Sequence, residues 1–284
     1  MRVLLIARLT FSEAFRRKMI LAVLLLSVLF LALYVFGFQI FREDMLQYRQ
    51  ERLGRAQDLL PYDVQASAMV LLGLYTVNFL AGIMTIFAAV GAISGEIEAG
   101  TFQSILPKPI SRWEIITGKY LGFLVMIAVY VGLMVGGVVL VSRIVGHLMP
   151  PNIFHGLALM ILVAAILLAL TMFGSTIFST MANGIVVLML YGMALTGGLV
   201  EQVGAALDND TMVRIGVITS VVLPSDSMWR LASDVVQPPS AVDLLGPTPF
   251  GTISPPSEFA VRYAVAYCVI LVAVSAITFN RRDI

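Results

Sequence analysis

Charged side chains are scarce in this sequence. Asp, Glu, Lys and Arg together make up 12% of the 284 residues, whereas hydrophobic residues make up 59%. A soluble domain typically carries about 25% charged residues, so this chain lacks the polar surface that a water-soluble particle of its size needs. The composition predicts an all-α polytopic membrane protein. The net charge of +1 argues against nucleic acid as a partner.

Cysteine and histidine are almost absent. The single cysteine, Cys268, excludes an internal disulfide and any metal site built from several cysteines. The two histidines, His147 and His155, fall at an outer loop and at the start of an apolar run. No His-Glu-x-x-His or Gly-x-Ser-x-Gly motif occurs. We therefore expect no catalytic, cofactor-binding or metal site in this chain.

A nucleotide site is also missing. A P-loop requires Gly-x-x-x-x-Gly-Lys-Ser/Thr, because its backbone N–H groups surround the phosphates and its lysine neutralises them. Gly95 and Gly100 have the spacing of the two glycines, but Thr101 and Phe102 follow in place of the lysine and hydroxyl residue. If ATP drives this protein, another chain must bind the ATP and its Mg²⁺.

Long apolar runs are the main feature that is present. About 20 apolar residues cross the ~30 Å of bilayer hydrocarbon, and six runs qualify: approximately residues 19–41, 68–93, 120–145, 153–180, 185–203 and 259–279. An even number of spans puts both termini on one side. Basic residues cluster near both ends of the chain, at Arg2, Arg8, Arg16, Arg17, Lys18, Arg281 and Arg282. The positive-inside rule then predicts cytoplasmic termini, with residues 1–284 forming a single transmembrane domain.

Three segments outside these runs have helical patterns of their own. Residues 2–18 alternate apolar and basic positions, which suits an interfacial helix on the inner leaflet or simply a basic flank for the first span. The predicted outer loops are 42–67 and 207–257. The second contains Ile215–Leu223, too short to span and expected to be re-entrant or buried. An amphipathic helix follows, with Asp226 and Arg230 at the favourable i, i+4 spacing.

The polar segment 94–119 separates the second and third runs. Ser111 and Glu114 form a Ser-x-x-Glu pair just before an apolar run, which predicts a helix N-terminus closed by a capping box. Pro107 and Pro109 are expected to stop any helix that arrives from Glu96. The segment therefore predicts a short helix, a break, and a newly capped helix that leads into the third span.

Few polar residues lie inside the runs. Asn78 and Glu201 are candidates for a transport pathway, because buried polar groups in a membrane often mark one. The alternative for Glu201 is contact with water at the outer surface. Thr171, Ser175 and Ser179 lie on one face of the fourth run, where we expect their hydroxyls to bond carbonyls of their own helix.

Segment 94–119 also resembles the signature loop of ABC-2 type transporter permeases. Many members have arginine where this chain has Ile97, so one charge of the pattern is absent. The residues that match are Gly95, Glu96, Glu98, Gly100, Thr101, Leu106, Pro109, Ile110, Ser111, Arg112, Gly118 and Lys119. The match is local, about a tenth of the chain, and the order of the apolar runs extends it to full length.

This resemblance implies the permease subunit of an ABC exporter in the cytoplasmic (inner) membrane. A homodimer or heterodimer of permeases would carry a pair of separate ATPase subunits, touched by a coupling helix after the second span and by a short turn at Met181–Gly184. The coupling residues would be Glu96, Glu98, Gly100, Thr101, Phe102 and Leu106. The alternative, by resemblance to the nitrous-oxide-reductase maturation permeases, is a non-exporting relative that acts on an extracytoplasmic partner protein. The substrate stays open among lipids, drug-like hydrophobes, polysaccharides and peptides.

The predicted topology can be tested with single cysteines at three positions. Lys108→Cys should lie in the cytoplasm, whereas Arg49→Cys and Ser240→Cys should lie outside, because six spans separate two basic ends. In intact cells, an impermeant thiol reagent should label the second and third variants and not the first. Labelling of Lys108→Cys from outside would exclude this topology.

Overall fold

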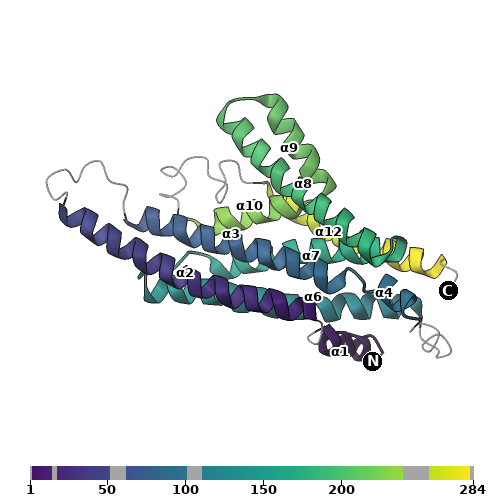
Figure 1. The fold of residues 1–284 in the computed structure, drawn as a ribbon. Helices are drawn as coiled ribbons and strands as arrows, with labels where there is room; N and C mark the ends of the chain where they lie inside the picture. Colours follow the sequence, from purple (N-terminus) through teal and green to yellow (C-terminus); the bar gives the residue numbers. More distant parts are fainter. Residues whose placement is uncertain (1, 15–17, 52–61, 101–110, 239–255, 282–284) are drawn as a thin grey trace.

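The computed structural model describes residues 2–14, 18–51, 62–100, 111–238 and 256–281, and all the regular structure in these ranges is helical (Figure 1). Six helices are long and apolar enough to cross a membrane: α2, α3 together with α4, α6, α7, α8 and α12. The predicted all-α class and the six spans are therefore confirmed. The helices are α1 (Arg2–Ala14), α2 (Lys18–Glu51), α3 (Tyr62–Ala89), α4 (Ser94–Glu98), α6 (Arg112–Ile144), α7 (Ile153–Ile177), α8 (Thr180–Ala206), α9 (Asp210–Val222), α10 (Ser225–Val236) and α12 (Glu258–Arg281).

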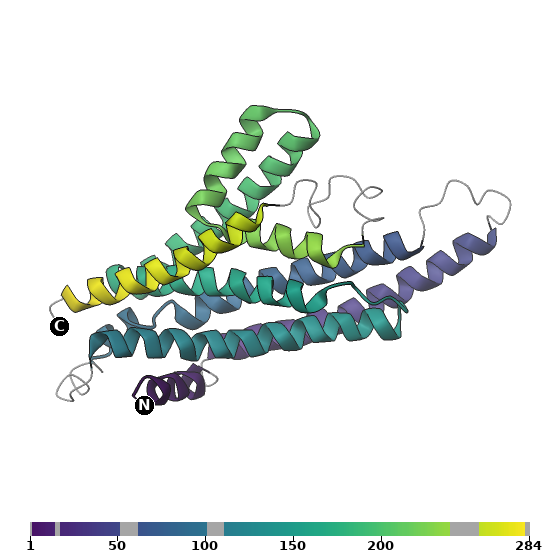
Figure 2. The ribbon, with the colours of Figure 1, turned by 180° about the vertical axis from the view of Figure 1, so that it is seen from behind.

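Both termini lie at the same end of the helix bundle, which we call the terminal end (Figures 1 and 2). The short helix α4, the start of α6 and the junction between α7 and α8 lie at this end as well. A larger share of residues is buried in α3 and α7 than in α2 and α12. The bundle is thus built around α3 and α7, while α2 and α12 expose apolar faces of the kind that lipid or another subunit covers.

Several helix ends differ from the sequence prediction. Helix α2 continues to Glu51 and α3 already begins at Tyr62, so much of the predicted outer loop 42–67 extends the two spans. The predicted turn at Met181–Gly184 is wrong, because the chain breaks at Phe178 and Ser179, whose backbones are extended. Asn183 and Gly184 have the composition of a turn, yet Asn183 is fully buried inside α8.

Helix α1 packs across the first turns of α6. Gly118 and Gly122 of α6 make the close approach possible, since an added Cβ would lie 2.8 Å from Ile6 and 2.6 Å from the Ala7 carbonyl oxygen. The other side of α1 exposes three leucines, Leu4, Leu5 and Leu9. This pattern agrees with the interfacial helix predicted for residues 2–18, whose position in the membrane stays a prediction.

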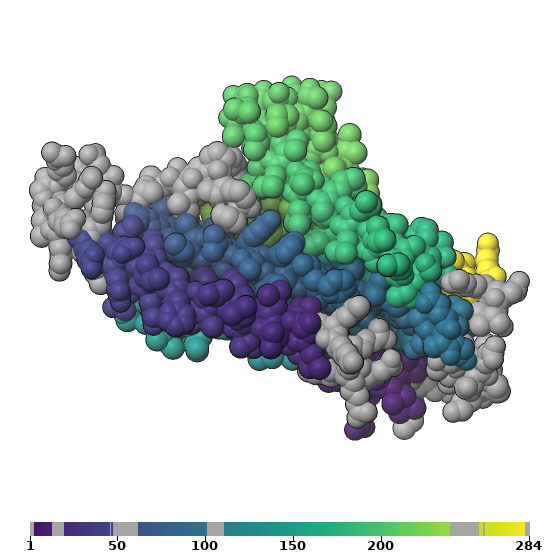
Figure 3. All heavy atoms as spheres, in the orientation of Figure 1, coloured from purple at the N-terminus to yellow at the C-terminus, as the bar shows by residue number. Residues whose placement is uncertain are grey.

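Helices α8 and α9 form an antiparallel hairpin that stands away from the bundle (Figure 3). Glycines allow close contact between the two helices, because Cβ atoms added at Gly197, Gly204 or Gly216 would clash with the opposite helix. The buried alternative for Ile215–Leu223 is wrong for the part that forms α9, whose only buried residue among those described is Gly216. The re-entrant alternative stays a prediction.

The hairpin contact can be tested with two alanine substitutions in α8. In Gly204→Ala, the new Cβ would lie 2.6 Å from the Met212 Cβ and 2.9 Å from the Val213 backbone nitrogen. Because backbone cannot move aside cheaply, we expect a loss of roughly 1–3 kcal/mol, the usual range for overpacking.

Gly192→Ala is the matched control, since nothing lies within 4 Å of its added Cβ. It should be neutral or slightly stabilising, because alanine is the better helix former by up to ~1 kcal/mol. Thermal unfolding in detergent measures both variants. Equal midpoints for the two would contradict the close hairpin contact.

Candidate functional site

A first candidate site lies at the terminal end, around the five-residue helix α4. The helix ends before the prolines that were expected to stop it. Gly100 adopts the left-handed conformation, with φ of 68°, and its N–H donates to the Ile97 carbonyl at 3.0 Å. Glycine is the usual residue at this position because it has no Cβ to clash. The predicted coupling residues Thr101, Phe102 and Leu106 lie outside the described residues.

Glu96 of α4 forms an ion pair with Lys119 of α6. The exposed fractions of the two side chains are only 18% and 10%, so the pair is largely shielded from water. Lys119 also donates a 2.6 Å hydrogen bond to the carbonyl of Ala92, in the turn between α3 and α4. A shielded charge is stable only when it is paired. Lys119 therefore holds both α4 and the turn before it against α6.

Glu98 binds the first residue of α8. Its two carboxylate oxygens accept hydrogen bonds from the Thr180 backbone N–H and from the Thr180 hydroxyl, each at 3.2 Å. The first N–H groups of any helix lack partners within that helix, and Glu98 supplies one for α8. Both predicted coupling acids therefore have partners inside this chain, and their proposed contact with an ATPase stays a prediction.

Ser175 of α7 closes the start of α4. Its hydroxyl oxygen accepts hydrogen bonds from the backbone N–H groups of Ile93 and Ser94, both at 3.0 Å. The Ser94 hydroxyl contacts the hydroxyls of Ser175 at 3.2 Å and of Thr180 at 2.9 Å. The expectation of a bond within the same helix is thus wrong for Ser175, although Thr171 does donate to the Leu167 carbonyl at 2.6 Å.

Asn183 completes this polar network from α8. Its amide nitrogen donates to the carbonyl of Val90, at the end of α3, at 2.8 Å and to the carbonyl of Thr171 in α7 at 3.0 Å. The side chain is fully buried. One amide thus serves a carbonyl of the turn after α3 and a carbonyl of α7. The sequence did not single out Asn183 or Lys119 as network members, because neither residue type nor spacing identifies such distant partners.

The start of α6 is fixed in the same region. Ser111 and Glu114 form the capping box, in which the Glu114 N–H donates to the Ser111 hydroxyl at 3.3 Å and the Ser111 N–H donates to the Glu114 carboxylate at 3.0 Å. Arg112 donates a 2.7 Å hydrogen bond to the Phe279 carbonyl near the end of α12. Arg112 therefore joins the end of α12 to α6 at the terminal end of the bundle.

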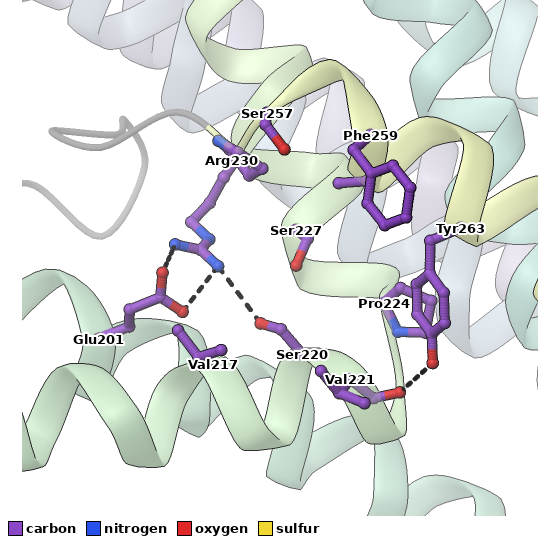
Figure 4. A pocket seen from close by; sticks show the side chains of 12 residues that line it. Glu201, Val217, Ser220, Val221, Pro224, Ser227, Arg230, Ser257, Phe259 and Tyr263 are labelled. Carbon is purple, nitrogen blue, oxygen red and sulfur yellow. Dashed lines mark hydrogen bonds and ion pairs between the residues drawn. The ribbon is translucent and has the colours of Figure 1, made fainter.

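A second candidate site lies where the α8–α9 hairpin meets α10. Arg230 of α10 binds Glu201 of α8 through both guanidinium NH₂ groups, at 2.7 and 2.9 Å, and also donates to the Ser220 hydroxyl of α9 at 3.3 Å (Figure 4). Asp226, one turn earlier in α10, lies 3.1 Å from the Arg230 Nε. The predicted i, i+4 ion pair is therefore present. The pathway role of Glu201 stays a prediction, although its carboxylate is paired with the Arg230 guanidinium.

Burial changes the acidity of Asp226. Its exposed fraction is 5%, and Gly198 of α8 has no Cβ, which makes room for the carboxylate against that helix. Desolvation raises the pKa of Asp226 to about 7, with a further increase from Glu201 and a partial offset from Arg230. Near neutral pH, this carboxyl group is therefore divided between its charged and neutral forms.

A cavity of about 470 Å³ opens beside Arg230 and Glu201. Apolar residues of α9 and α12 form most of its walls. The polar part of the lining, which we call the floor, consists of Glu201, Arg230 and the hydroxyls of Ser220 and Ser227 (Figure 4). Tyr263 and Tyr267 of α12 donate to the carbonyls of Val221 and Val222 at 2.6 and 3.0 Å, which fixes the end of α9 against α12.

Asn78 takes part in neither hydrogen-bonded network among the described residues. It is buried in α3, with an exposed fraction of 3%, and its side chain makes no hydrogen bond with another described residue. Its neighbour Phe79 stacks on Tyr191 of α8 at 6.3 Å between ring centres. The pathway role predicted for Asn78 stays a prediction.

Comparison with protein families matches residues 4–284 to the model described as ABC-2 family transporter protein. This range takes in both candidate sites and all six spans. A search of curated proteins finds no match.

The raised pKa of Asp226 predicts a pH-dependent stability. Since the pKa is about 7 in the folded protein and about 3.9 in an unfolded chain, the folded state binds more protons between these values. The contribution of Asp226 to stability should therefore be full below about pH 4 and be lost as the pH rises to about 7.

Asp226→Asn should remove this decline. Thermal unfolding of the detergent-solubilised chain across that pH range should give a flatter profile for the variant than for the wild type. Asp208→Asn is the matched control, because Asp208 is an exposed acid in the α8–α9 turn. If wild type and Asp226→Asn keep parallel profiles, Asp226 does not titrate in this range.

Proposed function

Because the chain belongs to the ABC-2 family of transporter proteins, we propose that it is the permease subunit of an exporter in the cytoplasmic (inner) membrane. Family membership makes it the membrane subunit of an ABC transporter, which works with a separate ATP-binding subunit. In the proposal, two permease subunits, identical or different, carry two ATPase subunits that hold the ATP and Mg²⁺. Both termini then lie in the cytoplasm.

The polar network around α4 is the observation that carries the proposal. A helix of five residues is not stable by itself, so the position of α4 depends on its bonds to Lys119 of α6, Ser175 of α7 and Thr180 of α8. Movement of α4 therefore has to move these helices or break the bonds. We propose α4 as the coupling helix that transmits ATPase closure to the spans.

The two coupling acids have different roles in this proposal. Glu96 faces Lys119 and links α4 to the membrane helices, whereas the outward contact with the ATPase comes from the exposed Ala99 and Gly100 and from the residues that follow them. The family resemblance supports Thr101, Phe102 and Leu106 as part of that contact. Glu98 lies in the sequence between Glu96 and the residues proposed to contact the ATPase. It is exposed and binds α8.

A second candidate function is action on an extracytoplasmic partner protein. The observation in its favour is the α8–α9 hairpin, which stands away from the bundle and exposes Leu207, Ile218 and Val221 (Figure 3). Lipid, a second permease or a partner protein could cover these side chains. Stable co-purification of an outer protein with the transporter, lost on shortening the hairpin, would favour this function over export.

A charge exchange tests whether Glu96 links helices or docks on the ATPase. We expect Lys119→Glu alone to break a shielded ion pair, at a cost of the order of 3 kcal/mol, and to uncouple the subunits. The double variant Glu96→Lys with Lys119→Glu restores opposite charges and should recover part of the coupling. Recovery is partial because a glutamate cannot donate to the Ala92 carbonyl.

Coupling is measured as the ATP-dependent change in distance between spin labels on Leu207→Cys of two permease subunits, together with ATPase retention on purification. Leu207 is well exposed, and the native Cys268 is buried. Arg143→Met is the matched control, because it removes an exposed cation from the same helix as Lys119. If the exchanged pair retains the ATPase no better than Lys119→Glu, the acid at position 96 acts in docking instead.

A further inference from the structure

We propose that the cavity between α9, α10 and α12 binds an amphiphile that carries an ammonium group, with the ammonium against Glu201 and the alkyl part against α9 and α12. This site is a further property of the subunit and does not depend on the direction of transport. The shape of the cavity, the charge on its floor and the apolar side chains at its mouth all favour such a ligand.

The cavity has the size and lining of a small-molecule site. Its volume of about 470 Å³ falls within the ~300–1,000 Å³ typical of ligand pockets. Val217 and Val221 of α9 and Ala260 of α12 supply apolar walls, and polar groups gather at one side. Such an arrangement holds a ligand that is apolar over most of its length and polar at one end.

The charged groups on the floor favour a cation. Arg230 already donates hydrogen bonds to Glu201 and Ser220 and forms an ion pair with Asp226. Glu201 and Arg230 line the cavity and their charges sum to zero, and Asp226, which pairs with Arg230 outside the lining, can only add a negative charge. The floor therefore never presents a net positive charge. An anionic head group would compete with Glu201 for Arg230 in a poorly solvated place, which is unfavourable.

The same floor is rich in hydrogen-bond acceptors. Each carboxylate oxygen of Glu201 has lone pairs beyond the one that Arg230 uses. The hydroxyls of Ser220 and Ser227 can accept as well, and the Ser227 hydroxyl has no hydrogen-bond partner among the described residues. An ammonium group offers donors only and therefore matches these acceptors. The aromatic rings of Phe259 and Tyr263 also line the cavity and can add cation–π attraction.

The mouth of the cavity favours entry from an apolar phase. Val217, Val221 and Phe259 line the cavity while exposing about half or more of their surface, with exposed fractions of 47%, 57% and 71%. Large exposed apolar side chains on a membrane subunit face lipid or a partner. An amphiphile dissolved in the bilayer could slide along these side chains with its ammonium group leading into the polar floor.

Photo-crosslinking tests the charge preference on the wild-type chain in lipid nanodiscs. The probe is a dodecylammonium with a diazirine in its chain, and the matched probe is the corresponding dodecanoate. We expect the ammonium probe to label peptides of α9 and α12 about tenfold more than the carboxylate probe, the effect of about 1.4 kcal/mol. Unlabelled dodecylammonium should compete, and unlabelled dodecanoate should not.

A steric substitution locates the site without changing its charges. Ala260→Trp fills the cavity and should abolish most of the labelling, whereas Ala266→Trp, on the same helix but outside this cavity, should leave it unchanged. Thermal unfolding checks that both variants remain folded. Equal labelling by the two probes, labelling unchanged in Ala260→Trp, labelling elsewhere or no labelling at all would each overturn the proposal.

Discussion

A helix that breaks inside a packed protein must find partners for its backbone groups, because buried N–H and C=O groups cannot bond water. This constraint explains the terminal end of the bundle. The chain breaks between α3 and α4 and again between α7 and α8, and the two breaks satisfy each other. Ser175 accepts N–H groups from the first break, Asn183 donates to its Val90 carbonyl, and Glu98 serves the N–H of Thr180 at the second. A geometry required for stability thereby joins α4 to α7 and α8.

The far part of the molecule solves a related problem with charges. Helix α10 is short and carries an aspartate and an arginine that are almost fully buried. Its apolar face fits the interior, where Trp229 packs edge-on against Tyr75 of α3 with ring centres 5.5 Å apart. Its charged face is stable only because Glu201 arrives from α8 to bind Arg230. This ion pair is thus one of the contacts that hold the α8–α9 hairpin to α10.

The sequence predicted the features that depend only on residues close together in the chain. The six spans follow from length and composition, the Ser111–Glu114 cap from a three-residue spacing, and the Asp226–Arg230 pair from one helical turn. Partners distant in the chain could not be found in this way. Ser94 meets Ser175 across 81 positions, and Glu201 meets Arg230 across 29, through helix packing that no short motif encodes. The predicted turn at Met181–Gly184 was wrong for the same reason, because the Asn183 amide bonds carbonyls in the protein interior and does not form part of a turn.

The tyrosines of α12 also have a consequence for biogenesis. The last carbonyls of a helix have no partner within it, and in α9 the carbonyls of Val221 and Val222 receive theirs from Tyr263 and Tyr267. These residues belong to α12, which follows α9 in the chain and leaves the ribosome after it. During synthesis, α9 therefore exists for a time without its closing bonds, and the region around Glu201 and Arg230 lacks one wall. Placement of α12 completes this region, so the final packing of the α8–α9 hairpin depends on a helix that is synthesised after it.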